Sequence, residues 1–199
     1  MECSHQDPVR IFSRSSVQRG AMQYKPPRKN IGPSQFATIL EYSSFQTPGE
    51  LKHELEEGSI REVCAAQTFG IEKEGAARKY YEKIRACKVI KSPWVRQGRI
   101  LGKGDGMVGE DGGLEIKCHW GRSYPLNEVP LYYMTQIVGY LWLYKREWWD
   151  LMSCCYDKET GKISSHRIHR VYWKDWENVW NQTWLPRIES FINAVEWKE

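Results

Sequence analysis

The residue pattern of this chain changes near Lys88, and this change limits its possible folds more than any other feature. Before it, apolar and capping residues recur at helical spacing. After it, β-branched and apolar segments at residues 88–95, 98–108 and 114–118 alternate with glycines, as strands and turns do. Helices followed by strands predict an α/β (α+β) fold with a mixed central β-sheet flanked by helices.

Three helices are expected before Lys88. Ser34 follows Gly-Pro and can serve as the N-cap of a short helix that runs towards Tyr42. Residues 47–50, Thr-Pro-Gly-Glu, offer a turn and the start of a second helix. Residues 59–62, Ser-Ile-Arg-Glu, have the form of a capping box that opens a third helix, which continues to residue 84.

The second half of the chain alternates between helices and strands. Residues 130–147 carry apolar side chains at helical spacing, and residues 148–157 and 162–173 resemble strands joined by a turn. From Lys174 a tryptophan-rich stripe predicts an amphipathic helix that is bent at Pro186. Such a stripe is typical of a core or a subunit interface, so we do not assign it to DNA.

The chain length fits one domain with an extension, since 199 residues are few for two independent enzyme domains. Residues 1–30 hold six basic and two acidic residues, which equals the whole net charge of +4. We therefore expect a basic, partly disordered N-terminal arm at residues 1–30 and a single domain at residues 31–199. A basic arm suits a polyanion, although a solvated tail has the same composition.

An intracellular, soluble protein is expected. The longest apolar-aromatic stretch, residues 137–144, is far shorter than the ~20 residues of a membrane span. The N-terminus carries charge where a secretory signal carries its apolar run. The six cysteines include no CxxC pair, which favours reduced thiols, and Cys154 and Cys155 lack zinc-finger spacing to His166 and His169.

Asp105, Glu115 and Lys117 form the most informative local pattern. If the strands around the glycine-rich turn pair with Val108 opposite Leu114, Asp105 lies opposite Lys117 and diagonal to Glu115. All three side chains then share one face of the hairpin.

Two carboxylates beside an ammonium group indicate a site for a divalent cation, and hard oxygen ligands favour Mg²⁺ or Mn²⁺ over zinc. The cation could polarise a phosphodiester oxygen. Lys117 could orient or deprotonate the attacking water and stabilise developing negative charge. A solvated hairpin face with one salt bridge would show the same residue types, so this pattern alone leaves both interpretations open.

Four stretches resemble the PD-(D/E)xK nuclease superfamily, and more closely the phage lambda exonuclease or YqaJ-type viral recombinase family. In chain order they are RKNIGPSQFATIL, FGIEKEGAARKYYE, GKGDGMVGEDGGLEIKC and PLYYMTQIVGYLWLYKREWWDLMSCCYD. They extend from Arg28 to Asp157. The resemblance implies a restriction-endonuclease-like core around the mixed sheet.

The resemblance also implies roles for individual residues. Asp105, Glu115 and Lys117 correspond to the catalytic and metal-binding residues, with the Ile116 carbonyl as a further ligand. Glu74, in Gly-x-x-x-Glu-x-x-Ala, corresponds to a helix-borne acid that completes the site through water, with two Mg²⁺ ions per site. An ordinary exposed acid that pairs with an arginine one helical turn later is the alternative for Glu74.

A pocket for the terminal 5′-phosphate is implied as well. Ser34, Arg28, Gln136 and Lys103 correspond to its DNA-binding residues, and a helix N-terminus suits an anion. Arg28 lies one residue closer to the serine than in the phage pattern, so Lys25 or Lys29 could take its role. Gly104 replaces the proline of the superfamily name, and Lys103 stands where a small hydroxyl residue can occur.

The implied activity is Mg²⁺-dependent hydrolysis of linear double-stranded DNA by a 5′→3′ exonuclease that leaves 3′ single-stranded tails for recombination or repair. The implied partners are DNA ends, a single-strand annealing protein and two further copies in a homotrimer. A phage- or virus-encoded protein acting in a host cell fits this family. Two alternatives remain open: a structure-selective endonuclease, and a DNA-binding or assembly protein that keeps the fold without catalysis.

Overall fold

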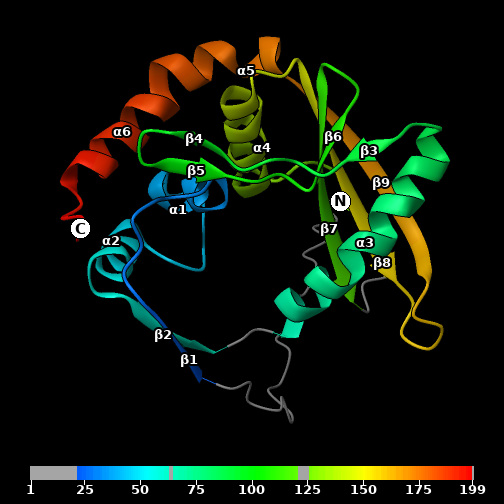
Figure 1. Cartoon of the computed structure of the whole chain (residues 1–199), viewed down its shortest axis with the longest axis horizontal. Helices are drawn as coiled ribbons and strands as arrows, with labels where there is room; N and C mark the ends of the chain where they lie inside the picture. The colour runs from blue at the N-terminus through cyan, green and yellow to red at the C-terminus, as the bar shows by residue number, and fades with distance from the viewer. Residues whose placement is uncertain (1–21, 63–64, 121–125, 199) are drawn as a thin grey trace, which may run out of the picture.

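The computed structural model describes residues 22–62, 65–120 and 126–198. Its centre is a five-stranded sheet with the order β3-β6-β7-β8-β9 (Figure 1). The strands are β3 (Val89–Ile90), β6 (Gly106–Val108), β7 (Gly112–Trp120), β8 (Trp148–Tyr156) and β9 (Ile163–Tyr172). β7 and β8 are parallel and the other neighbours are antiparallel, which confirms the mixed sheet.

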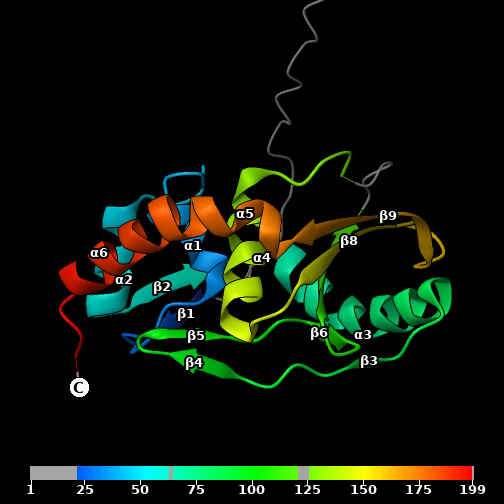
Figure 2. The same cartoon turned by 90° about the horizontal axis from the view of Figure 1, so that it is seen from above.

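Two helices cover opposite faces of this sheet, α3 (Ala65–Arg85) and α4 (Leu131–Tyr144) (Figures 1 and 2). Successive side chains of β8 alternate between the two faces. Leu151 belongs to the core cluster that contains Ile137 of α4. Its neighbour Met152 belongs to the cluster that contains Tyr81 of α3. The sheet therefore lies between helices, as predicted.

The remaining elements lie outside this sheet. They are β1 (Met22–Lys25), η1 (Pro33–Gln35), α1 (Phe36–Ile39), α2 (Pro48–Glu57), β2 (Ser59–Glu62), β4 (Val95–Gln97), β5 (Ile100–Gly102), α5 (Trp173–Val179), η2 (Trp180–Trp184) and α6 (Leu185–Ala194). Figure 1 shows α5, η2 and α6 in an arc that leads from β9 to the C-terminus. Trp180 and Trp184 of this arc are buried, so the predicted tryptophan stripe forms core.

The second predicted helix is confirmed as α2. The Thr47 hydroxyl accepts a hydrogen bond from the Glu50 N–H, and the Glu50 carboxylate accepts one from the Thr47 N–H, which completes a capping box. The short helix after Ser34 also exists, but as η1 followed by α1. Its N-cap is Gly32, and Ser34 is the second residue of η1, so the capping role predicted for Ser34 is wrong.

The prediction that Ser59 opens a helix is wrong. Gly58 ends α2 with φ of 81°, and Ser59–Glu62 continues as β2. β2 pairs antiparallel with β1, with Ser59 opposite Lys25. A pairing partner distant in the chain therefore overrides the local capping-box pattern, and the helix begins only at α3.

The folded region starts earlier than Ile31, because β1 is formed by Met22–Lys25 within the segment predicted as an arm. Residues 1–21 of that arm lie outside the described residues. A bend is predicted at Pro186, and the helix there has an irregularity in the form of a π-helical segment, η2, which ends at Trp184, two residues before the proline. There the Leu185 N–H donates to the Trp180 carbonyl, five residues back.

The hairpin of β6 and β7 has a different register from the predicted one. Val108 pairs with Gly112 and Gly106 pairs with Leu114, so the turn is two residues shorter on the β7 side. Gly112 and Gly113 belong to the strand because the rings of Trp148 and Trp149 on β8 occupy the space where their side chains would lie. Asp105 is therefore placed opposite Glu115, and the prediction that it lies opposite Lys117 is wrong.

Gly113→Ala is expected to destabilise the protein by roughly 1–3 kcal/mol, because its Cβ would overlap the buried Trp149 ring and overpack the core. Urea unfolding measures the change. Gly75→Ala is the matched control, since a Cβ there meets nothing and alanine favours the interior of α3. Equal stabilities of Gly113→Ala and the unmodified chain would contradict the packing argument.

A buried ion-pair network holds α3 against the sheet. Asp150 on β8 is fully buried and accepts hydrogen bonds from Arg170 Nε at 2.8 Å and from the Tyr81 hydroxyl at 2.7 Å. Arg85 Nη2 donates to the same carboxylate at 3.2 Å. Because Tyr81 and Arg85 both belong to α3, this network fixes the position of the helix that carries Glu74.

Two predictions from composition can be compared with the described residues. Cys87, Cys118, Cys154 and Cys155 are free thiols, as expected, whereas Cys3 and Cys64 lie outside the described residues. Within the described part of the chain, none of the helices has the length and apolar character needed to cross a lipid bilayer.

Candidate nuclease site

Asp105 lies directly beside β7, at the residue before β6 begins. Its N–H donates to the Leu114 carbonyl at 3.1 Å. Its carboxylate oxygen Oδ2 accepts a hydrogen bond from the Ile116 N–H at 2.7 Å. These two backbone contacts hold the Asp105 carboxylate against the middle of β7, next to Glu115.

Glu115 and Lys117 occupy alternate positions of β7 and share the face that α4 covers. Lys117 Nζ donates to Glu115 Oε1 at 2.8 Å and to Gln136 Oε1 at 3.1 Å. Gln136 Nε2 donates to the same Glu115 oxygen at 2.8 Å. Gln136 therefore fixes both charged groups from α4.

The two carboxylates lie close together without full compensation, with Glu115 buried and Asp105 partly buried. Glu115 is 4% exposed, and its second oxygen, Oε2, has no hydrogen-bond partner among the residues that the structure describes. Burial, together with the charges of Glu115 and Glu74, raises the pKa of Asp105 to about 8. An arrangement of this kind favours a positive charge that the protein itself does not fully supply.

Lys117 supplies part of that charge. Burial is the largest influence and acts to lower its pKa, but Glu115, with Tyr133 and Asp105, outweighs burial and holds the pKa of Lys117 above its ordinary value. Its ammonium group also lies 4.7 Å from the centre of the Tyr133 ring, a cation–π contact. Lys117 is therefore a charged group that is held in place by three neighbours.

Glu74 approaches this group from α3. Its carboxylate forms an ion pair with Arg78, the residue one helical turn later, as the alternative interpretation anticipates. Arg78 Nε in turn donates to the Asp105 carbonyl at 3.0 Å. Glu74 is thus close enough to influence the Asp105 carboxylate while its own charge is paired with Arg78.

A cavity of about 520 Å³ opens onto these side chains. Its lining includes Glu74, Asp105, Glu115, Ile116 and Lys117. Among the described residues, no group of three or more His, Cys, Asp or Glu side chains is close enough to hold a metal ion. Asp105 and Glu115 are the pair that the fold brings together, and Glu74 stands at the edge beside Arg78.

The residues predicted to bind a terminal phosphate divide between two places. Arg28, Lys29, Ser34 and Lys103 line a second cavity of about 620 Å³. Gln136 lies outside that lining, in the carboxylate site. Arg28 Nη2 also forms an ion pair of 2.6 Å with the buried Glu54 carboxylate.

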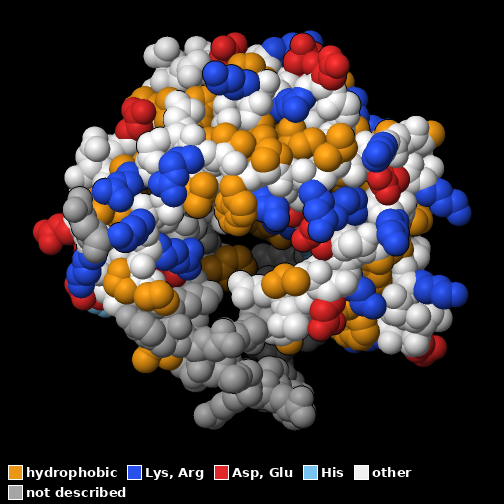
Figure 3. Space-filling view, in the orientation of Figure 1, with side chains coloured by type: hydrophobic (Ala, Val, Ile, Leu, Met, Phe, Trp, Pro, Cys, Tyr) orange, Lys and Arg blue, Asp and Glu red, His pale blue; other side chains and the backbone are white. Residues whose placement is uncertain are grey.

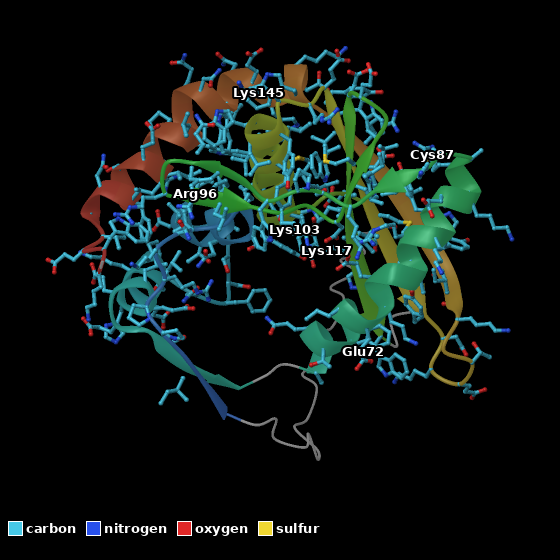
Figure 4. The ribbon with its side chains drawn as sticks, in the orientation of Figure 1. Glu72, Cys87, Arg96, Lys103, Lys117 and Lys145 are labelled. Atoms are coloured by element: carbon cyan, nitrogen blue, oxygen red, sulfur yellow. The ribbon has the colours of Figure 1, made fainter. Side chains whose placement is uncertain are left out.

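Basic side chains gather on both sides of a central hollow on one face of the molecule (Figure 3). Lys103 and Lys117 both lie at the centre of that face, from the segment after β5 and from β7 (Figure 4). Lys103 lines the second cavity and Lys117 the first, so positive charge continues from one to the other.

A family model for the YqaJ-like viral recombinase domain matches residues 24–147. The chain belongs to this family. No curated protein sequence matches it. The mixed sheet between helices that the sequence predicts is the fold that this chain shares with solved exonuclease structures.

Solved structures of exonucleases resemble this member of the YqaJ-like family. An alkaline exonuclease (LHK-Exo) from Laribacter hongkongensis is 19% identical, with a TM-score of 0.66, and the match covers 83% of this chain and 87% of that chain. The same exonuclease in complex with dAMP matches at 18% identity with the same TM-score and coverage. A phage related exonuclease from Haemophilus somnus 129PT is 14% identical, with a TM-score of 0.60 and coverage of 83% and 91%.

One departure from the superfamily pattern has a structural explanation in this YqaJ-like domain. Gly104 replaces proline, and the Trp149 ring lies against its Cα, where any side chain would overlap it. The Gly104 N–H also donates to the Tyr144 hydroxyl at 3.2 Å, a bond that proline lacks.

Sequence reasoning missed the link between the two cavities. The Tyr140 hydroxyl donates to the Lys103 carbonyl at 3.1 Å and contacts Gln136 Nε2 at 3.3 Å. Tyr140 also lines the second cavity. Its position four residues after Gln136, on the same face of α4, was the available signal.

Proposed function

We propose that this chain is a Mg²⁺-dependent deoxyribonuclease that degrades one strand of linear double-stranded DNA in the 5′→3′ direction and leaves 3′ single-stranded tails. The observation that carries the proposal is the pair of carboxylates, the buried Glu115 and the partly buried Asp105, beside the charged Lys117 in one cavity. The exonuclease fold supports it, and the dAMP complex of LHK-Exo supports a nucleotide as the ligand.

The carboxylate site fits a divalent cation. Glu115 Oε2 is buried without a partner among the described residues, and the raised pKa of Asp105 reflects uncompensated charge. Asp105, Glu115 and the Ile116 carbonyl would hold Mg²⁺, or Mn²⁺ in its place, and Glu74 would contribute through water after release from Arg78. The family resemblance suggests two ions. Such a cation supplies electrostatic stabilisation to the charge that develops on the phosphodiester oxygens.

The other residues of the site position and neutralise the substrate. The Lys117 ammonium group is held by Glu115 and Gln136, so it faces the cavity with little freedom to move. Its charge would stabilise the developing negative charge of the phosphodiester and orient the attacking water. Gln136 would act through Lys117 and Glu115, as a positioning residue.

Six incubations test the proposal against its alternatives. Linear duplex labelled at either the 5′ or the 3′ end is compared with covalently closed duplex, with and without Mg²⁺. An exonuclease degrades only the linear DNA, and the order in which the two labels appear as short products gives its polarity. Cutting of the closed duplex would favour a structure-selective endonuclease. Binding of ends without cutting in Mg²⁺ or Mn²⁺ would favour an assembly protein.

A preference for 5′-phosphorylated ends is expected from the second cavity. A terminal phosphate carries more negative charge than an internal phosphodiester, and Arg28 and Lys103 would bind it beside Ser34. Arg28→Ala is expected to slow degradation of phosphorylated ends by roughly tenfold to a hundredfold, at ~1.5–3 kcal/mol for one charge-assisted contact. Degradation of 5′-hydroxyl ends should be unchanged.

Rates on the two kinds of end, for the same protein preparation, give this comparison an internal control for folding. That control matters because Arg28 pairs with the buried Glu54. Lys29→Ala is the matched variant, since Lys29 lines the same cavity. If Lys29→Ala abolishes the preference and Arg28→Ala retains it, Lys29 holds the phosphate. Equal rates of the unmodified chain on both ends would reject the pocket.

The proposed partners follow from the family. We propose a homotrimer that encloses DNA and hands the 3′ tail to a single-strand annealing protein, in a phage- or virus-infected cell. Light scattering of the chain with and without DNA ends measures the assembly, and a monomer under conditions of activity would reject it.

A further inference from the structure

The indole of Trp94 is exposed beside the basic cavity and beside a third cavity that reaches Asp105. Its side chain is 65% exposed, although tryptophan is the largest apolar side chain that the protein could bury. Trp94 lines the cavity of Arg28 and Lys103 and also a cavity of about 770 Å³ whose lining includes Glu74 and Asp105. It therefore stands between the basic pocket and the carboxylates.

The segment that carries Trp94 is held firmly although its ring is exposed. The preceding carbonyl, that of Pro93, accepts a hydrogen bond of 2.6 Å from the Tyr144 hydroxyl of α4. Ser92 is buried, at 4% exposure, and Val95 begins β4 directly after the tryptophan. A fixed backbone with an exposed ring gives a preorganised contact surface, because little conformational freedom is lost when a ligand binds.

Lys103 lies next to the ring, with Nζ 5.7 Å from its centre. An aromatic ring beside a cation is the combination that proteins use to bind single strands, since the ring stacks on a base and the cation contacts the backbone. A DNA strand with its 5′-phosphate in the basic pocket and its next phosphodiester near Asp105 would have to pass Trp94. Its first bases would then lie within reach of the indole.

From this geometry we infer that Trp94 stacks on a nucleobase at the 5′ end of the strand that is cut, while Lys103 contacts the terminal phosphate of that strand. The inference rests on the proposed function, because it needs a strand that connects the two cavities. Stacking on the face of a base is tolerant of sequence, so the contact would hold any terminal nucleotide. Its role is to position the strand, and Trp94 takes no part in the chemistry.

Binding measurements on uncut DNA test the contact. The Asp105→Asn chain, in Ca²⁺, is titrated with linear duplexes that carry a 5′-phosphate and one abasic site at each of the first four nucleotides in turn. Trp94→Ala in this background is expected to weaken binding of intact DNA by roughly tenfold, within the range for loss of one stacked base. Trp94→Phe should recover part of the affinity. Phe45→Ala, which removes another exposed ring at a different cavity, should change nothing.

The abasic substrates decide whether the ring contacts a base. At one of the four positions, loss of the base should weaken binding to the Asp105→Asn chain by about the same factor as Trp94→Ala does. The same abasic site should not weaken binding to the chain that also carries Trp94→Ala. An equal loss in both chains at every position, or unchanged affinity of Trp94→Ala, would overturn the inference. Binding is measured on uncut DNA, so the two proposals can fail separately. If the Asp105→Asn chain shows this coupling but the unmodified chain never cleaves DNA, only the nuclease function is rejected. If the unmodified chain cleaves DNA but the coupling is absent, only the stacking is rejected.

Discussion

Asp105→Asn and Glu115→Gln are each expected to reduce cleavage of linear duplex by about a thousandfold or more and to leave binding of DNA nearly unchanged. Each removes a carboxylate that would hold the cation, and loss of several kcal/mol of charge stabilisation corresponds to a factor of this size. DNA binding depends on basic groups that neutralise phosphates, and both substitutions keep all of those side chains. Gel assays of cleavage in Mg²⁺ and of binding in Ca²⁺ measure the two effects separately.

Matched controls are available on the same hairpin. Glu110→Gln and Asp111→Asn make the same chemical changes at exposed positions of the turn between β6 and β7, and both should retain full activity. Near-normal cleavage by Asp105→Asn or Glu115→Gln in Mg²⁺ would show that the assigned site is wrong.

Thermal unfolding provides a second readout that does not depend on activity. Without divalent metal, Asp105→Asn is expected to unfold at a higher temperature than the unmodified chain, because burial and the Glu115 charge disfavour an ionised carboxylate at this position and an amide carries no charge. Mg²⁺ should stabilise the unmodified chain, since a ligand that binds only the folded state raises its stability, and it should stabilise this variant much less.

The type and order of most elements could be predicted from the chain because local patterns and tertiary contacts agree there. The capping residues Thr47 and Glu50 start α2, and the apolar spacing around Ile137 forms the buried α4. β8 and β9 lie where alternating and apolar runs predict them. In each case the pattern covers enough residues for one kind of element to be favoured.

The failures come from contacts between distant segments. Residues Ser59–Glu62 satisfy a helix-capping pattern, but β1 offers them hydrogen-bond partners that a local pattern does not reveal. The hairpin register depends on Trp148 and Trp149, more than thirty residues after the turn, whose rings leave room only for Gly112 and Gly113. A two-residue shift keeps each side chain on its original face, so Asp105, Glu115 and Lys117 still share one.

In the candidate site too, residues that are close in the chain could be grouped from the sequence, and residues brought together by packing could not. The three charged residues lie within one hairpin, so their spacing in the chain was enough to group them. Gln136 could be selected only by family resemblance, and its contacts with Glu115 and Lys117 depend on how α4 packs on the sheet. Trp94 had no local signal, because its importance comes from its place between two cavities.

Lys117→Ala is expected to reduce the rate of cleavage by roughly a hundredfold to a thousandfold, the cost of removing one preorganised charge or donor from a developing anion. The loss should fall on kcat, with little change in KM, because Lys117 is one cation among many that attract the DNA. Lys158→Ala, on the exposed turn after β8, is the matched control and should cleave normally.

Lys117→Arg distinguishes charge from geometry at this position. The Lys117 ammonium group fits between Glu115 Oε1 at 2.8 Å, Gln136 Oε1 at 3.1 Å and the Tyr133 ring. A guanidinium group keeps the positive charge, but it is planar, larger and never deprotonated in proteins, so it cannot occupy the same space or accept a proton. We expect Lys117→Arg to be impaired at least about tenfold in kcat, as fixed geometry at a reacting centre requires. Full activity of Lys117→Arg, with Lys117→Ala inactive, would show that positive charge alone is needed and would remove the lysine from any role in proton transfer.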